Sequence, residues 1–179
     1  MLIYRNGTFT NDPWHRLGDA LPIRHGRRQI LPLAIWRTVL DDAAYDPAMT
    51  GVDVNAHDVE ASDLMELSRV ALVVITFPKF TDGRAYSLAR RLRDSFGYQG
   101  GLRATGDVLL DQIGLMERCG FDSFEIVHAP TIRALEASRI PSLATVYQAG
   151  AIRDHERARP TSRRPERRHA ELAPLHQRG

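Results

Sequence analysis

Two successive strand-loop-helix passages fill residues 77–112 (FPKFTDGRAYSLARRLRDSFGYQGGLRATGDVLLDQ), and no other feature constrains the fold of this chain as much. The run before them, VALVVIT at residues 70–76, is β-branched and apolar on both faces, which is typical of a central parallel strand covered on both sides. The next stretch predicts a helix over Gly83–Phe96 that ends at Gly97. A second helix is expected over residues 108–118.

Shorter patterns extend this alternation in both directions. Residues 30–39 (ILPLAIWRTV), 51–56, 101–105 and 123–127 predict further strands, and residues 57–69 and 129–138 predict helices. Strands that alternate with helices predict an α/β fold with a mostly parallel sheet of about five strands and helical crossovers. A doubly wound sheet is favoured, and a partial barrel built from the same units is the alternative.

The two ends of the chain differ from this central domain at residues 30–150. Asn6-Gly7 between two strand-like triplets predicts an N-terminal hairpin, within an otherwise irregular arm at residues 1–29 that Trp14 anchors to the core. Residues 151–179 contain eight Arg and four acidic residues with few large apolar ones, which predicts a disordered basic tail. The net charge of +2 and the pI of about 9.0 therefore reflect the tail, and nucleic acid is not an expected partner.

Composition excludes several classes of protein. The longest apolar run, residues 70–75, is too short to cross a bilayer, and residues 1–10 lack a secretory pattern, so a cytoplasmic location is expected. Cys119 is the one cysteine, which excludes an intramolecular disulfide, a CxxC redox pair and an all-cysteine iron–sulfur site. A redox reaction would need an organic cofactor or a partner protein.

Charged residues follow two predicted strands, and they locate a candidate ligand-binding site. Its members are Lys79, Asp82, Arg84, Arg103 and Asp107. Loops at the carboxyl ends of neighbouring parallel strands lie side by side, and each of these loops leads into a helix N-terminus that favours negative charge. The site is therefore expected to bind a small anion or a phosphate-bearing ligand. In the competing interpretation, the two aspartates only cap helices and the basic residues only pair with acids.

Other candidates for chemistry are weaker. Cys119 at a predicted helix end is interpreted as a small buried side chain, Tyr86 as a packing residue, and Asp111 as a solvated charge on the same helix face as Asp107. There is no GxGxxG after a strand, no P-loop and no metal-ligand spacing, so no metal is expected. Nicotinamide or flavin could bind only in a non-standard mode.

The segments FPKFTDGRAYSLARRLR, GLRATGDVLLDQ and RCGFDSFE resemble a bacterial domain-of-unknown-function family that is described as an oxidoreductase involved in sulfite reduction. The resemblance covers residues 30–148 and is densest over residues 77–125. It implies a role in assimilatory sulfate reduction but assigns no catalytic residue. Two functions follow from it. The first is a role as an oxidoreductase or ligand-binding protein with the anion-facing site. The second is a non-catalytic accessory role as a partner of sulfite reductase or another sulfate-assimilation protein.

Overall fold

The computed structural model describes residues 2–17, 26–43 and 45–137. The predicted tail at residues 151–179 lies outside this part of the chain. Among the described helices, none is both long enough and apolar enough to cross a membrane.

Eight strands form one sheet in the order β2-β1-β8-β7-β6-β5-β4-β3. Their bounds are Leu2–Arg5 (β1), Thr8–Asn11 (β2), His15–Arg16 (β3), Gln29–Pro32 (β4), Thr50–Asn55 (β5), Leu72–Phe77 (β6), Gly101–Gly106 (β7) and Ser123–Phe124 (β8). All neighbours from β3 to β8 are parallel, and β1 joins β8 and β2 in antiparallel pairs. The expected α/β fold with a mostly parallel sheet is therefore confirmed, although the sheet has eight strands and not about five, because the N-terminal hairpin and β3 join it.

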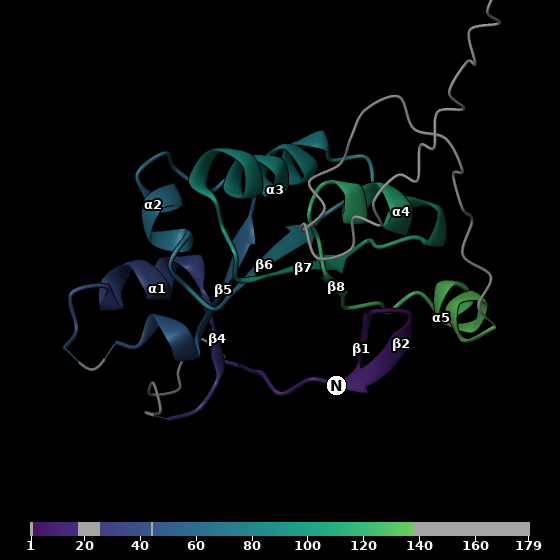
Figure 1. Cartoon of the computed structure of the whole chain (residues 1–179), viewed down its shortest axis with the longest axis horizontal. Helices are drawn as coiled ribbons and strands as arrows, with labels where there is room; N and C mark the ends of the chain where they lie inside the picture. Colours follow the sequence, from purple (N-terminus) through teal and green to yellow (C-terminus); the bar gives the residue numbers. More distant parts are fainter. Residues whose placement is uncertain (1, 18–25, 44, 138–179) are drawn as a thin grey trace, which may run out of the picture.

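The strand order distinguishes between the two expected arrangements. From β3 to β8 each strand lies beside the next one in the chain, without the reversal that defines a doubly wound sheet. The favoured doubly wound arrangement is therefore wrong, and the sheet curls into a half-barrel, which is the alternative that the sequence offered (Figure 1).

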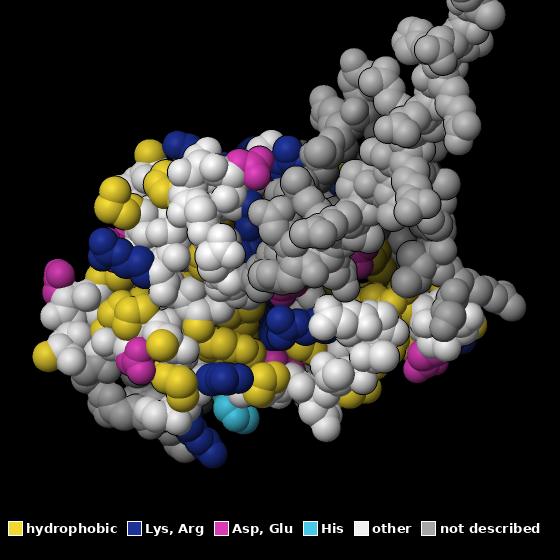
Figure 2. Space-filling view, in the orientation of Figure 1, with side chains coloured by type: hydrophobic (Ala, Val, Ile, Leu, Met, Phe, Trp, Pro, Cys, Tyr) yellow, Lys and Arg dark blue, Asp and Glu magenta, His cyan; other side chains and the backbone are white. Residues whose placement is uncertain are grey.

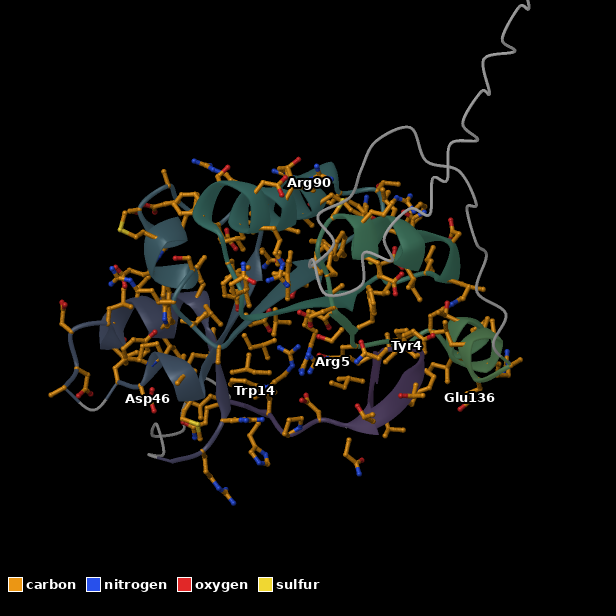
Figure 3. The ribbon with its side chains drawn as sticks, viewed as in Figure 1. Tyr4, Arg5, Trp14, Asp46, Arg90 and Glu136 are labelled. Carbon is orange, nitrogen blue, oxygen red and sulfur yellow. The ribbon has the colours of Figure 1, made fainter. Side chains whose placement is uncertain are left out.

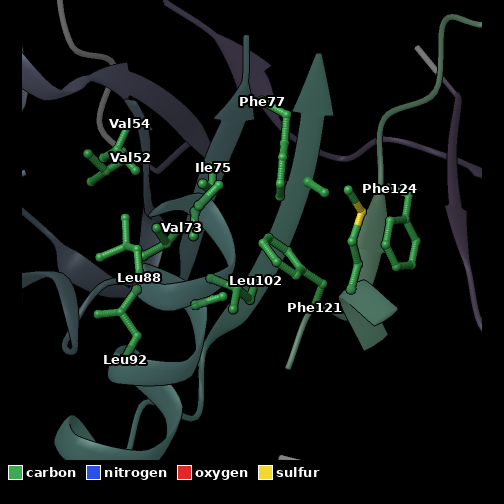
Figure 4. Packing of buried hydrophobic residues seen from close by; sticks show 14 of the residues in the cluster. Val52, Val54, Val73, Ile75, Phe77, Leu88, Leu92, Leu102, Phe121 and Phe124 are labelled. Atoms are coloured by element: carbon green, nitrogen blue, oxygen red, sulfur yellow. The ribbon is translucent and has the colours of Figure 1, made fainter. Parts of the chain in front are cut away.

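One helix follows each strand from β4 to β8. These helices are α1 (Leu33–Val39), α2 (Asp63–Leu67), α3 (Gly83–Phe96), α4 (Leu110–Arg118) and α5 (Ala129–Glu136), with a short 3-10 turn at Pro47–Met49. In Figure 1, α3 and α4 cover the outer face of the sheet. Figure 4 shows the layer between them, where Val73, Ile75 and Leu102 of the sheet face Leu88 and Leu92 of α3. The predicted bounds of α3 are confirmed, and Gly97 ends the helix with a φ of 61°.

The prediction of one strand over residues 30–39 is wrong. The strand β4 ends at Pro32, and α1 follows directly. The apolar residues of this run fit the period of a helix as well as that of a strand, because Leu33 and Trp36 lie about one helical turn apart and both are buried. Length and periodicity alone cannot separate a strand from a helix in so short a run.

The N-terminal hairpin is confirmed. Asn6 and Gly7 have φ of 50° and 80°, as a two-residue turn between β1 and β2 requires. The arm that follows runs under the concave inner face of the half-barrel, opposite α3 and α4 (Figure 3). There Trp14 packs against the buried side chains of Ile30, Leu72 and Val74, so its expected anchoring role is confirmed.

Candidate functional site

A pocket of about 480 Å³ lies at the carboxyl ends of β5 and β6. It is lined by His57, Pro78, Lys79, Thr81, Asp82 and Arg84. His57 belongs to the loop between β5 and α2, and the other lining residues belong to the loop between β6 and α3 and to the first turn of that helix. Loops that leave adjacent parallel strands thus form the pocket, which is where ligands bind in sheets of this kind.

The β6–α3 loop is held in shape by its own hydrogen bonds. The backbone N–H of Asp82 donates to the carbonyl of Lys79 at 3.0 Å, which closes a tight turn. The Asp82 carboxylate then accepts from the backbone N–H of Arg84 at 3.1 Å and so caps α3, as the sequence predicted. This backbone hydrogen bond and the Arg84 guanidinium hold the pKa of Asp82 below its usual value, so its side chain is charged at neutral pH.

The fixed charges around the pocket sum to a small positive value. Arg84 Nε lies 3.2 Å from the Asp82 carboxylate, so these two charges offset each other, while the Arg84 side chain stays 69% exposed. Lys79 is exposed, and none of the described carboxylates forms an ion pair with it. It is also the one lysine among the 24 Lys and Arg residues of the chain. At this pocket, the charge of Lys79 is therefore the one that no described carboxylate offsets.

Asp107 supports the pocket from outside. Its carboxylate accepts from the backbone N–H of Phe80 at 3.0 Å, and its own N–H donates to the carbonyl of Phe77 at 2.9 Å. The expected start of the next helix at residue 108, with Asp107 as a possible cap, is wrong, because α4 begins at Leu110 and no side chain caps it. Asp107 instead connects the β7–α4 loop to the β6–α3 loop.

Arg103 lies away from the other predicted site residues. It belongs to β7, which runs on to Gly106, and its side chain points to the concave face. There it is 2% exposed and forms a bidentate pair with Asp12 of the arm, with Nη–Oδ distances of 2.7 and 2.9 Å. The structure therefore brings Lys79, Asp82 and Arg84 together at the pocket and does not bring Arg103 there.

The weaker sequence candidates have packing roles. Burial raises the pKa of the Cys119 thiol, so it remains protonated, and the side chain is 8% exposed. Tyr86 stacks edge-on against Phe77, and its hydroxyl lies 2.9 Å from Gln112 Oε1. Burial, with the nearby Cys119 and Asp111, raises the pKa of Tyr86 to about 12.

Sequence reasoning missed His57 as a pocket residue. Its Nε2 lies 3.3 Å from Asp58 Oδ1, and its imidazole faces the same space as Lys79. The sequence did contain a signal for this role, because His57 directly follows the predicted strand at residues 51–56. Only the strand order, however, shows that this strand is the neighbour of β6.

The described residues contain no group of three or more His, Cys, Asp or Glu side chains placed to hold a metal ion. On the face shown in Figure 2, Lys and Arg side chains are separated by apolar and uncharged surface and form no continuous basic patch.

Comparison with curated proteins and with solved structures finds no match. A family model described as "Bacterial protein of unknown function (DUF934)" matches residues 51–158, which include β5 to α5 and every residue that lines the pocket. This match spans more than half of the 179 residues, and the chain therefore belongs to this bacterial family.

Proposed function

We propose that this protein binds a small oxyanion, of the sulfite or sulfate class, in the pocket beside Lys79. The observation that carries the proposal is the position of Lys79, an exposed cation without a carboxylate partner among the described residues, at the carboxyl edge of a parallel sheet. An ammonium group is a compact charge with three donors, and it can contact a tetrahedral or pyramidal oxyanion from several sides. Arg84 and the N-terminus of α3 add donors at the same pocket.

The family resemblance supports a role for this binding step in assimilatory sulfite reduction, and we propose that the step takes place in the cytoplasm. We propose that the protein acts there as an oxidoreductase or as a ligand-binding protein. The single cysteine gives the chain no dithiol of its own. Electron transfer would therefore require a nicotinamide or flavin, bound in a mode without the usual glycine-rich motif, or a partner that carries the electrons.

The single lysine makes a direct test possible. Reductive methylation with ¹³C-formaldehyde labels Lys79 and the terminal amine, and the Lys79→Ala variant identifies which NMR signal belongs to Lys79. Sulfite and sulfate should shift the Lys79 signal saturably, and chloride at equal ionic strength should not. A Lys79 signal that responds only to ionic strength would contradict the proposal.

Calorimetric titration of variants complements this experiment. Lys79→Ala should weaken oxyanion binding by about tenfold or more, and Lys79→Arg should keep part of the affinity because it keeps the charge. Arg84→Ala should have a smaller effect, because Asp82 already offsets that charge. Arg69→Ala is the matched control, since Arg69 pairs with Glu66 on α2 and does not line the pocket.

A non-catalytic accessory role with sulfite reductase is the second candidate. Exposed apolar side chains favour it: Leu2 in β1 is 56% exposed and Val127, just after the paired strand β8, is 71% exposed. Purified sulfite reductase should then co-elute with the wild-type protein and less with a Leu2→Ser, Val127→Ser double variant. Lys79→Ala should leave that co-elution unchanged, which separates the two candidates.

A further inference from the structure

The concave face of the half-barrel is divided into an apolar and a polar half. The amino-terminal half carries Ile30, Leu72 and Val74, covered by Trp14. Across the carboxyl-terminal half, the register places Asn55 of β5 beside Thr76 of β6, and Thr76 beside Thr105 of β7. Polar side chains are costly to bury in a sheet unless they gain partners. Within the described part of the chain, the side chains of Asn55 and Thr105 have no hydrogen-bond partner.

Two carboxylates converge on this polar half from opposite sides. Asp53 lies in β5 and Glu125 directly follows β8, with β6 and β7 between them. In a flat sheet, three strand spacings would separate them by about 14 Å. The curl of the half-barrel instead lets one guanidinium, that of Arg16 in the arm, contact both: Nη2 lies 2.6 Å from Glu125 Oε2, and Nη1 bonds to Asp53 Oδ2.

The surroundings of this pair of carboxylates support it as a built site. The hydroxyl of Thr76 donates to Asp53 Oδ1 at 2.9 Å, which orients the carboxylate and leaves its other oxygen for the cation. Glu125 is buried, with its side chain 8% exposed. On β7, between β5 and β8, Arg103 Nε is a fully buried donor without a partner among the described residues. Such an unsatisfied donor indicates a missing acceptor, from water or from a ligand.

Arg16 is less buried than Glu125, the more enclosed of its two carboxylate partners. Its side chain is 35% exposed, and β3 is an edge strand of two residues. Trp14 and Leu17 hold the arm backbone independently, through apolar burial and through the hydrogen bond from Leu17 N to Ile30 O at 2.9 Å. The Arg16 side chain can therefore swing out by rotation about its own bonds while the arm stays in place.

From these contacts we infer that the polar half of the concave face is a second ligand site, which binds a small organic cation with a guanidinium or primary ammonium group, and that Arg16 fills it in the absence of ligand. The cation lies between Asp53 and Glu125. A neighbouring oxygen acceptor of the ligand takes the Arg103 Nε–H and the hydroxyl of Thr105. This site is separate from the Lys79 pocket, because the two have no lining residue in common and opposite charge preference.

Methylguanidinium serves as the probe, and the two tryptophans provide an internal comparison. Trp14 lies on the concave face, whereas Trp36 is fully buried and its indole N–H donates to Tyr45. Titration of the wild-type protein should shift the Trp14 indole signal saturably at millimolar concentration and leave the Trp36 signal in place. Tetramethylammonium, which has the charge without N–H donors, should shift neither.

Removal of the internal competitor should strengthen binding. Arg16→Ala should bind methylguanidinium about tenfold tighter or more, since a tethered group acts at high effective concentration. Arg16→Lys, which keeps one charge but cannot bridge both carboxylates, is the alternative if the alanine variant does not fold. Glu125→Gln should abolish binding, and Arg69→Ala should behave like the wild type.

Three results would overturn the inference. These are the absence of saturable binding in both the wild type and the Arg16 variants, equal affinity of the wild type and Arg16→Ala, and binding by Arg16→Ala alone. The last result would mean that the probe fills only a gap left by truncation. None of them depends on whether the Lys79 pocket binds an oxyanion.

Discussion

Asp107 shows how one side chain can shape a pocket that it does not line. Its hydrogen bond to the Phe80 N–H fixes the loop that presents Lys79. Asp107→Ala should therefore weaken oxyanion binding about tenfold through a less ordered loop. Asp107→Asn, which keeps an acceptor oxygen, should bind nearly as well as the wild type. Amide hydrogen exchange of Phe80, measured beside the affinity, should be faster in the alanine variant only.

The asparagine variant separates this role from direct contact. If Asp107 faced the anion, loss of its negative charge would tighten binding, and a higher affinity of Asp107→Asn would refute the positioning role. Asp111→Asn is the matched control, because Asp111 is exposed and bonds to its neighbour Gln112.

Gly106 gives a second prediction at the same scale. Its φ is +89°, and a Cβ there would lie 2.4 Å from the carbonyl oxygen of Phe77. Gly106→Ala should lower the free energy of unfolding by more than about 2 kcal/mol, because both the backbone conformation and the space exclude a side chain. Gly83→Ala, with nothing within 4 Å of the new Cβ, should change it by less than about 1 kcal/mol in urea unfolding.

Individual site residues were predictable where local chemistry decides their place. Asp82 before an amphipathic helix reads as a cap, and with Lys79 and Arg84 it does lie at one pocket. Arg103 could not be placed in this way. Whether a strand ends before or after a charged residue depends on the neighbouring strands in the sheet. The ion-pair partner of Arg103, Asp12, is also 91 residues away in the sequence.

At the scale of elements, an ion pair joins α1 to the start of α2. Arg37 bonds to the Asp63 carboxylate at 2.6 and 3.0 Å, and the Glu60 N–H also donates to it. Burial acts to raise the pKa of Asp63, but the hydrogen bonds from Arg37 and Glu60 outweigh it and hold the pKa below its usual value. The contribution to stability is thus fully present above the pKa of the unfolded chain, and it is lost as the pH falls through the lower pKa of the folded state.

Asp63→Asn should accordingly reduce stability in a pH-dependent way. At pH 7 we expect a loss of about 1–2 kcal/mol, limited because Arg37 is partly exposed and solvent screens its charge. The difference from the wild type in urea unfolding should shrink below about pH 4. Glu66→Gln, in an exposed pair with Arg69, should cost little at any pH. A loss that stays constant from pH 7 to pH 3 would argue against the ion pair as its cause.

The elements themselves were predicted unevenly. The amphipathic helix α3 was predictable to the residue, because its apolar stripe, its cap and its terminal glycine agree. The helix α1 was not, because its seven residues are too few to show a period distinct from that of a strand. The short strand β3 carries no sequence signal of its own and exists because β4 offers it a free edge.

At the scale of the whole molecule, the arm completes the inner layer of the half-barrel. Trp14→Ala should expose Ile30, Leu72 and Val74 and lower the free energy of unfolding by about 2–3 kcal/mol, less than for a fully buried tryptophan. Hydrogen exchange should increase in β4 and at the start of β6 more than in β7. His15→Ala, an exposed neighbour in the same arm, should change neither quantity.

The α/β class followed from the alternation of strands and helices, but the strand order did not. A consecutive strand order and a reversed, doubly wound order have the same sequence patterns for strands and helices. The two orders differ only in the edge of the sheet to which each crossover adds the next strand. The polar half of the concave face could not be predicted from the sequence either. A strand that is apolar along its whole length does not show which of its residues face the concave side of a curled sheet.

The pairing of β1 with β8 has a consequence for how the chain reaches this state. Each parallel neighbour from β4 to β8 is joined through a single connection, whereas Tyr4 must meet Phe124, which is made much later in synthesis. Long loop closures are entropically slow, so the parallel strands should assemble first and the hairpin should dock last. On the ribosome, the hairpin of β1 and β2 would then emerge well before β8 and stay undocked until that strand is made.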